Sequence, residues 1–101
     1  MIIREWRGRA IPTDAAGYPE HFRKTVLPQL KRTSGFVGAH LARHELGDKI
    51  EFVVLTRWVS IDAVRAFAGT DMDKAVVEPG ARAALAEYDL HVRHYDVLEE
   101  A

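Results

Sequence analysis

The chain contains no cysteine, so disulfide bridges, thiolate metal sites and a cysteine nucleophile are excluded. This absence suits a reducing compartment, and we expect a cytoplasmic protein. The charges nearly cancel, with a formal net charge of −1, so no electrostatic attraction to nucleic acid is expected. The first residues, MIIREWRGRAI, alternate charged and apolar side chains and lack the apolar run of a signal peptide or membrane span. We therefore expect neither nucleic acid nor a membrane as a partner.

The composition is that of an ordinary globular protein, with 48% hydrophobic and 29% charged residues in a chain of 101. This length suits one core, and no repeat, linker or low-complexity tract divides it, so residues 1–101 are predicted to form a single domain. No nucleophile elbow, phosphate loop or dinucleotide fingerprint is present. The fold must therefore be predicted from periodicity.

The first third of the chain predicts a strand followed by a helix. Residues Ile2–Ile11 alternate loosely, as in a strand. Apolar residues at intervals of four from Tyr18 to Leu30 form one stripe of an amphipathic helix. Pro19 fits its first turn, whereas Pro28 lies inside it and should kink the helix or split off its last turn. The helix should end near Ser34-Gly35, where glycine can adopt a left-handed conformation.

The segment GAHLARHELGDKIEF raises the question of a metal site, because His40 and His44 would share one face of a helix. The segment instead predicts two strands, Phe36–Glu45 and Ile50–Val59, joined by a tight turn at Leu46–Lys49. On a strand, residues four apart lie roughly 13 Å from each other, too far for two imidazoles to hold one ion. We therefore expect no metal here.

The register of this hairpin follows if Gly47 and Asp48 are its two turn residues. A contact between His44 and Glu51 across the strands is then the simplest interpretation. The predicted pairs are His44 with Glu51, His40 with Leu55, and Gly38 with Arg57.

The second strand of the hairpin is apolar on both faces, at Phe52-Val53-Val54-Leu55. A strand with one face in water should alternate, so both faces of this strand are predicted to be covered. The chain's own helices can cover one face. A second copy of the chain is the expected cover of the other, which predicts a homodimer.

The rest of the chain predicts two helices and a last strand. Ser60 is a plausible cap for a helix that ends at Gly69, and Pro79 begins another that runs to Ala86. Residues Tyr88–Val97 alternate as a strand, which places neighbouring side chains on opposite faces. The order of strands and helices predicts an α+β fold, a ferredoxin-like βαββαβ subunit with an antiparallel sheet.

The stretches HFRKTVLPQLKRTSGFVGAHLARH, EFVVLTRWVSIDAVRAFAG and KAVVEPGARAALAEYDLHVRHYDV together resemble the antibiotic biosynthesis monooxygenase superfamily. The most characteristic parts are Ser34-Gly35-Phe36, Trp58 followed by Ser60-Ile61-Asp62, and the end of the last strand at His94-Tyr95. The resemblance covers nearly the whole chain and implies a dimeric α+β barrel. It also implies a range of activities, because the superfamily includes cofactor-independent oxygenases of aromatic polyketides, quinol oxygenases, haem-degrading enzymes and members without known activity.

The haem-degrading branch is recognised by an asparagine in the first strand, a tryptophan in the second helical segment and a histidine ten residues later. Alignment with that branch places Phe67 at the tryptophan and Val77 at the histidine, and the chain contains no asparagine. Valine cannot ligate iron, so haem oxygenation by that route is not expected. His21 and His94 are the alternative axial ligands to consider.

Oxygenation of a hydroxyarene or quinol without a cofactor needs a base, a dry pocket and donors that hold oxyanions. Histidine is the natural base because its pKa lies near cellular pH. We predict His94 as the base, no metal and no cofactor. The predicted pocket residues are Trp58, Trp6, Phe67, Tyr95 and His21.

Each candidate also has a purely structural interpretation. Trp58 on an apolar strand suits the core, His94 and Tyr95 suit a subunit contact, and His21 suits a solvated helix surface. The leading hypothesis is a cofactor-independent monooxygenase-like homodimer that acts on a small aromatic or quinone-type compound. The alternative hypothesis is a non-catalytic dimer that binds a small apolar or aromatic ligand or is stress-related. The third hypothesis is a haem-binding protein. An arginine, tyrosine or histidine converging inside the pocket would favour catalysis, whereas an all-apolar lining would favour binding.

Overall fold

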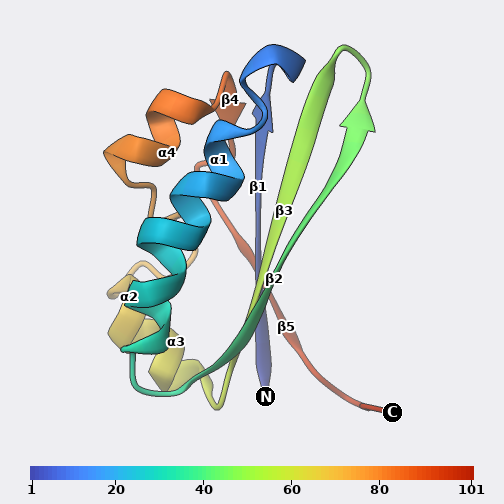
Figure 1. Cartoon of the computed structure of the whole chain (residues 1–101). Helices are drawn as coiled ribbons and strands as arrows, with labels where there is room; N and C mark the ends of the chain where they lie inside the picture. Colours follow the sequence, from blue (N-terminus) through green and yellow to red (C-terminus); the bar gives the residue numbers. More distant parts are fainter.

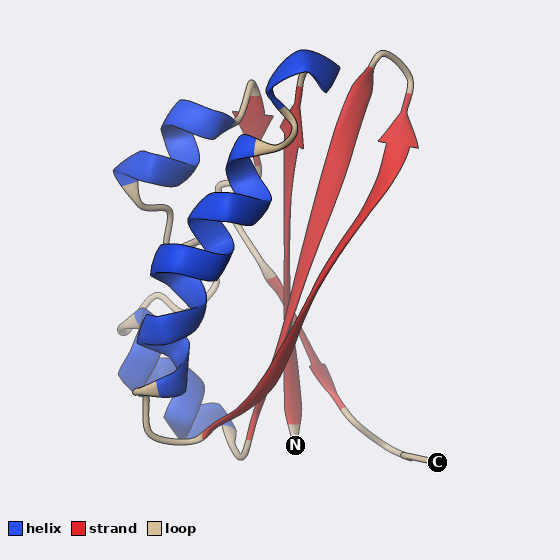
Figure 2. Ribbon diagram, viewed as in Figure 1, coloured by secondary structure: helices blue, strands red, loops and turns tan.

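The computed structural model describes residues 1–101 as one antiparallel sheet with its helices gathered on one face (Figures 1 and 2). The strands are β1 (Ile2–Ala10), β2 (Phe36–Leu46), β3 (Lys49–Trp58), β4 (Glu87–Tyr88) and β5 (Arg93–Asp96). The sheet order is β2-β3-β1, and both β4 and β5 pair with the other edge of β1, so β1 is central. The predicted α+β, ferredoxin-like arrangement with an antiparallel sheet is confirmed.

The helical segment between β1 and β2 changes its geometry along its length. It consists of η1 (Pro12–Asp14), α1 (Gly17–His21), a π-helical turn η2 (Phe22–Val26) and α2 (Leu27–Lys31). The Leu27 N–H donates to the carbonyl of Phe22, five residues earlier, and Pro28 then occupies the first turn of α2. Proline has no N–H to donate to the preceding turn, and the wider turn before it accommodates the ring within a continuous helical segment. The predicted break at Pro28 therefore takes the form of a wider turn before it.

The hairpin of β2 and β3 has the predicted register. His44 lies opposite Glu51, His40 opposite Leu55, and Gly38 opposite Arg57. The turn contains Gly47 with a φ of 61°, a conformation that suits glycine. His44 Nε2 lies 2.8 Å from Glu51 Oε1, which confirms the predicted cross-strand contact.

The helices that follow β3 are α3 (Ile61–Ala68) and α4 (Pro79–Ala84). The Ser60 hydroxyl accepts a hydrogen bond from the Ala63 N–H at 3.2 Å, so the predicted cap is confirmed. In Figure 1, α3 and α4 lie at opposite ends of the helical layer. None of the helices is long and apolar enough to cross a membrane.

The last strand is interrupted, and the prediction of one continuous strand over Tyr88–Val97 was wrong. Residues 90–92, between β4 and β5, bond to the segment that follows α3 instead of β1. The Val92 N–H donates to the Asp73 carbonyl at 2.8 Å, and the Ala75 N–H donates to the Leu90 carbonyl at 2.9 Å. Alternation in a sequence does not identify the segment to which a strand bonds. The change of hydrogen-bond partner from β1 to the segment after α3 could therefore not be predicted from the sequence.

The face of the sheet under the helices holds two buried clusters. One contains Tyr18, Phe22 and Phe52, and the other contains Trp58 and Val64. The even-numbered residues of β1 and β3 point to this side, which we call the covered face, and the odd-numbered residues point to the open face. Between the two clusters the covered face is hollow.

Candidate ligand cavity

The cavity on the covered face has a volume of about 90 Å³ and is lined by 14 residues, nine of them hydrophobic. β1 and β3 form its floor, and residues from the helical layer and the segment before α4 form its walls. Ring-bearing walls come from Trp6, Tyr18 and Phe67. The polar lining residues are Arg4, His21, Gln29, Thr56 and Glu78. An apolar hollow with a few polar groups is the usual form of a small-molecule site.

Arg4 is the charged residue most deeply buried in this cavity, with 5% of its surface exposed. It is held by the segment after α3, because its Nη1 donates to the Met72 carbonyl at 2.5 Å and its Nη2 donates to the Lys74 carbonyl at 2.9 Å. Its guanidinium also lies 5.8 Å from the centre of the Phe67 ring. Burial lowers the pKa of Arg4 to about 10, and the nearby charge of Asp73 opposes this shift. Arg4 therefore stays charged at neutral pH.

His94 lies behind Arg4 rather than in the cavity lining. Its Nε2 lies 2.9 Å from Arg4 Nη1, and its Nδ1 lies 3.4 Å from Asp73 Oδ1. Because arginine can only donate, these partners assign the imidazole as neutral with its proton on Nδ1. Burial and the charge of Arg4 lower the pKa of His94, while Asp73 acts in the opposite direction. His94 thus positions Arg4.

His21 and Tyr18 reach the cavity from α1. The Nε2 of His21 is buried and has no hydrogen-bond partner. The other edge of its ring abuts α4, where a Cβ on Gly80 would lie 2.6 Å from Nδ1, so a side chain at position 80 would displace the ring. Burial, and to a lesser extent the charge of Glu78, raises the pKa of the Tyr18 hydroxyl above its ordinary value. Tyr18 is therefore a protonated donor near an unsatisfied imidazole nitrogen.

Three of the predicted pocket residues, Trp6, Phe67 and His21, line the cavity. Trp58 does not, because it is fully buried in the core behind Phe67, whose ring centre lies 5.0 Å away. The Trp58 indole N–H donates to the Thr56 hydroxyl at 2.9 Å, so it supports a lining residue from behind.

Tyr95 lies on the open face, and its predicted place in the pocket is corrected. Neighbouring residues of a strand point to opposite sides, and β5 pairs His94 with Arg4 but Tyr95 with Ile3. The Tyr95 hydroxyl donates to Glu5 Oε1 at 3.2 Å on that open face.

Sequence reasoning missed Arg4, Tyr18 and Glu78 as lining residues. The alternation of β1 contained a signal for Arg4, because Arg4 and Trp6 share one strand face. For Tyr18 and Glu78 the signal was absent, since only the tertiary arrangement brings α1 and the start of α4 together.

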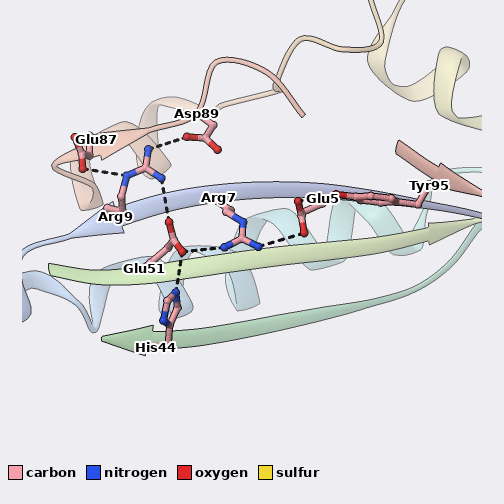
Figure 3. A network of polar contacts seen from close by, with 8 residues as sticks. All are labelled: Glu5, Arg7, Arg9, His44, Glu51, Glu87, Asp89 and Tyr95. Carbon is pink, nitrogen blue, oxygen red and sulfur yellow. Dashed lines mark hydrogen bonds and ion pairs between the residues drawn. The ribbon is translucent and has the colours of Figure 1, made fainter. Parts of the chain in front are cut away.

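The open face carries a network of charged groups (Figure 3). Glu51 lies at its centre and accepts hydrogen bonds from Arg7 at 3.0 Å, from Arg9 at 3.3 Å and from His44. Arg9 also pairs with Glu87 and Asp89. No three His, Asp or Glu side chains are arranged so that they could hold a metal ion.

The fold and the cavity define a class of ferredoxin-like α+β proteins with a ligand-sized hollow between sheet and helices. Within that class, the chain belongs to the antibiotic biosynthesis monooxygenase family, whose model matches residues 1–79. No curated protein is significantly similar in sequence.

Several solved structures have the same fold. A Deinococcus radiodurans protein named for antibiotic biosynthesis monooxygenase activity is 17% identical with a TM-score of 0.67, over 100% of this chain and 96% of that one. The heme-degrader MhuD of Mycobacterium tuberculosis, with two hemes bound, is 18% identical with a TM-score of 0.63, over 100% and 99%. SnoaB, a cofactor-independent oxygenase of Streptomyces nogalater, is 19% identical with a TM-score of 0.63, over 98% and 95%. At these identities the similarity shows the fold alone.

Proposed function

We propose that the chain is a cofactor-independent monooxygenase that acts in the cytoplasm on a small hydroxyarene or quinol. The observation that carries this proposal is the convergence of Arg4, Tyr18 and His21 on one apolar, aromatic-walled cavity. An all-apolar lining would instead have favoured passive binding. Membership of the monooxygenase family and the shared fold with SnoaB support the same chemistry.

In such a reaction the substrate itself supplies the electrons. A base removes the phenolic proton, and the resulting electron-rich ring carbon reduces dioxygen. One oxygen atom becomes a new ring carbonyl and the other leaves as water, so a phenol and O2 yield a quinone and H2O. The protein must hold the anion, exclude water and accept the proton.

Two histidines are candidates for the base. His94, predicted from sequence, has its Nε2 engaged by Arg4 and lies outside the lining. His21 lines the cavity and has an unpartnered Nε2, so the geometry favours His21 as the base and His94 as the residue that positions Arg4. Tyr18 would donate to the developing oxyanion.

Oxygen uptake with a panel of single-ring hydroquinones and phenols tests this proposal. His21→Ala should abolish turnover, whereas His94→Ala should weaken substrate binding more than it slows the chemical step. If His94→Ala abolishes turnover and His21→Ala does not, then His94 is the base. If no phenol or quinol stimulates oxygen uptake, the non-catalytic binding hypothesis replaces the enzyme.

We further propose that the protein is a homodimer joined through its open face. Val53 and Leu55 lie half-buried on that face, and no helix of the chain covers them (Figure 2). They form a small apolar site among the charged residues of the open face, and a second copy of the chain that packs on this face would cover it.

Haem binding is not favoured by this cavity. Its enclosed volume of about 90 Å³ limits a ligand to about one ring, part of which lies in the open mouth of the cavity, whereas a porphyrin has four pyrrole rings. Val77, at the position of the axial histidine, packs against the core. His21 is the one histidine in the lining, so a haem would need both this residue and a much larger space.

A further inference from the structure

Arg4 differs from the arginines of the same strand in having no carboxylate partner. Arg7 pairs with Glu5 and Glu51, and Arg9 pairs with Glu51, Glu87 and Asp89. Arg4 is more deeply buried than either, yet its partners are two backbone carbonyls and the neutral imidazole of His94. The nearest carboxylate, that of Asp73, reaches Arg4 only through the imidazole of His94, so no anion contacts the buried guanidinium directly. Because a buried cation is costly unless it is well paired, an anionic ligand would complete the site.

The guanidinium of Arg4 has donors left for such an anion. It carries five N–H groups in a planar fork, and the chain occupies three of them through the Met72 carbonyl, the Lys74 carbonyl and His94. The remaining donors suit an acceptor with two oxygens, such as a carboxylate. His94 and the two carbonyls fix the fork in place, so little side-chain entropy would be lost on binding.

The rest of the cavity selects an aromatic ring of limited size. Trp6 and Phe67 offer ring surfaces, and Val54 and Val92 complete an apolar wall. The enclosed volume of about 90 Å³ is smaller than the ~150 Å³ of an apolar cavity that binds benzene, so the ligand has at most one ring, and part of that ring lies in the open mouth of the cavity.

The charges in the cavity also give the ligand a direction. Arg4 contacts Phe67 of α3, whereas Glu78 directly precedes α4, and these helices lie at opposite ends of the helical layer (Figure 1). Glu78 repels an anion at its own end, and Arg4 attracts one at the other. The unpartnered Nε2 of His21 belongs to the α4 end, since the His21 ring abuts Gly80.

We propose that the cavity binds a single-ring aromatic carboxylate, with its carboxylate on Arg4 and its ring against Trp6 and Phe67. The inference rests on the proposed function in one respect, that this ligand is the substrate, which then belongs to the hydroxybenzoate class with its hydroxyl directed toward His21. Binding of the carboxylate itself does not depend on any oxygenation.

The wild-type protein tests this by isothermal titration with benzoate and with benzamide, which has nearly the same shape but no charge. Benzoate is expected to bind at least tenfold more tightly. Equal affinities, tighter binding of benzamide, or no binding of either compound at millimolar concentration would overturn the proposal. This comparison needs no variant, so it holds even if substitutions at Arg4 impair folding.

Variants then assign the effect to Arg4. Arg4→Gln should remove the preference for benzoate, and Arg4→Lys should retain part of it, because lysine keeps the charge but not the fork. Arg65→Gln on the exposed surface of α3 is the matched control and should change nothing. A preference for benzoate that survives Arg4→Gln in a folded protein would contradict the assignment. Benzoate binding without phenol-dependent oxygen uptake would remove the proposed function and leave this site intact.

Discussion

The two faces of the central sheet use the same residue types for different purposes. On the open face, Arg7 and Arg9 are matched by carboxylates, and the charges form a closed network around Glu51 (Figure 3). On the covered face, Arg4 is surrounded by apolar walls and neutral acceptors. The partner of a charged group, more than its burial, therefore separates a structural residue from a candidate ligand contact.

The apolar residues differ between the faces as well. Phe52, Val54 and Trp58 of β3 are buried under helices, whereas Val53 and Leu55 between them are only half-buried. The apolar side chains of β3 are therefore buried on the covered face but only half-buried on the open face.

Leu55→Asp should produce the largest change, since it places a charge in the centre of the proposed subunit contact. An unpaired buried carboxylate costs several kcal/mol, so we expect the dissociation constant of the dimer to be at least ~100-fold higher than in the wild type. Native mass spectrometry should show a dimer for the wild type and a monomer for the variant. Val59→Asp, at an exposed apolar residue outside the sheet, is the control and should remain dimeric. A folded Leu55→Asp protein with unchanged association would refute the homodimer through this face.

Glu51→Gln should have an intermediate effect, on stability. Hydrogen bonds from His44, Arg7 and Arg9 hold the pKa of Glu51 below its usual range. A lowered carboxyl pKa stabilises the folded state above the unfolded value of about 4.3, and this contribution is lost as pH falls through the folded pKa. Urea unfolding should therefore show a loss of about 1–2 kcal/mol at pH 7 and a smaller difference near pH 4.

Glu20→Gln is the matched control for that experiment. Glu20 pairs with Lys24 on an exposed helix surface, where such pairs contribute little. If both substitutions have the same small effect at pH 7, the network around Glu51 is not a stabilising unit.

His94→Gln should produce the smallest effect, on the pH dependence of the melting temperature. The pKa of His94 is lowered, so its neutral form stabilises the fold above the unfolded pKa near 6.5, and the contribution is lost as pH falls through the folded pKa. Glutamine can still accept from Arg4 but does not titrate, so the variant should lose less melting temperature than the wild type on acidification. His91→Gln, at an exposed histidine, should follow the wild-type curve. Superimposed curves for all three proteins would show that the pKa of His94 is not lowered in the folded protein.

Local patterns predicted the framework of this fold well. The turn glycine of the hairpin determined the register from His44–Glu51 to Gly38–Arg57, because a two-residue turn leaves no freedom in pairing. The apolar sequence Phe52-Val53-Val54-Leu55 correctly indicated a strand with apolar side chains on both faces. The break between β4 and β5 could not be predicted, because it depends on bonds to a distant segment.

The cavity was less predictable than the fold. Trp6, Phe67 and His21 were expected in the cavity and line it. Tyr95 does not line it because its side chain is on the open face, and Trp58 does not because it is buried in the core behind the lining. Arg4 was missed, because alternation along β1 places it on the same face as Trp6 but gives no information about how deeply that face is buried. Only the packing of the segment after α3 encloses it.

The close approach of Gly80 to the ring of His21 links two positions that lie far apart in the sequence. A Cβ at position 80 would meet the imidazole, so replacement of the glycine either displaces the ring from its present place or needs a smaller residue at position 21. In related chains these positions should therefore vary as a pair: glycine at position 80 wherever a ring stands at position 21, and larger residues where it does not. Joint variation of this kind would distinguish relatives that keep the imidazole in the cavity from those that have lost it.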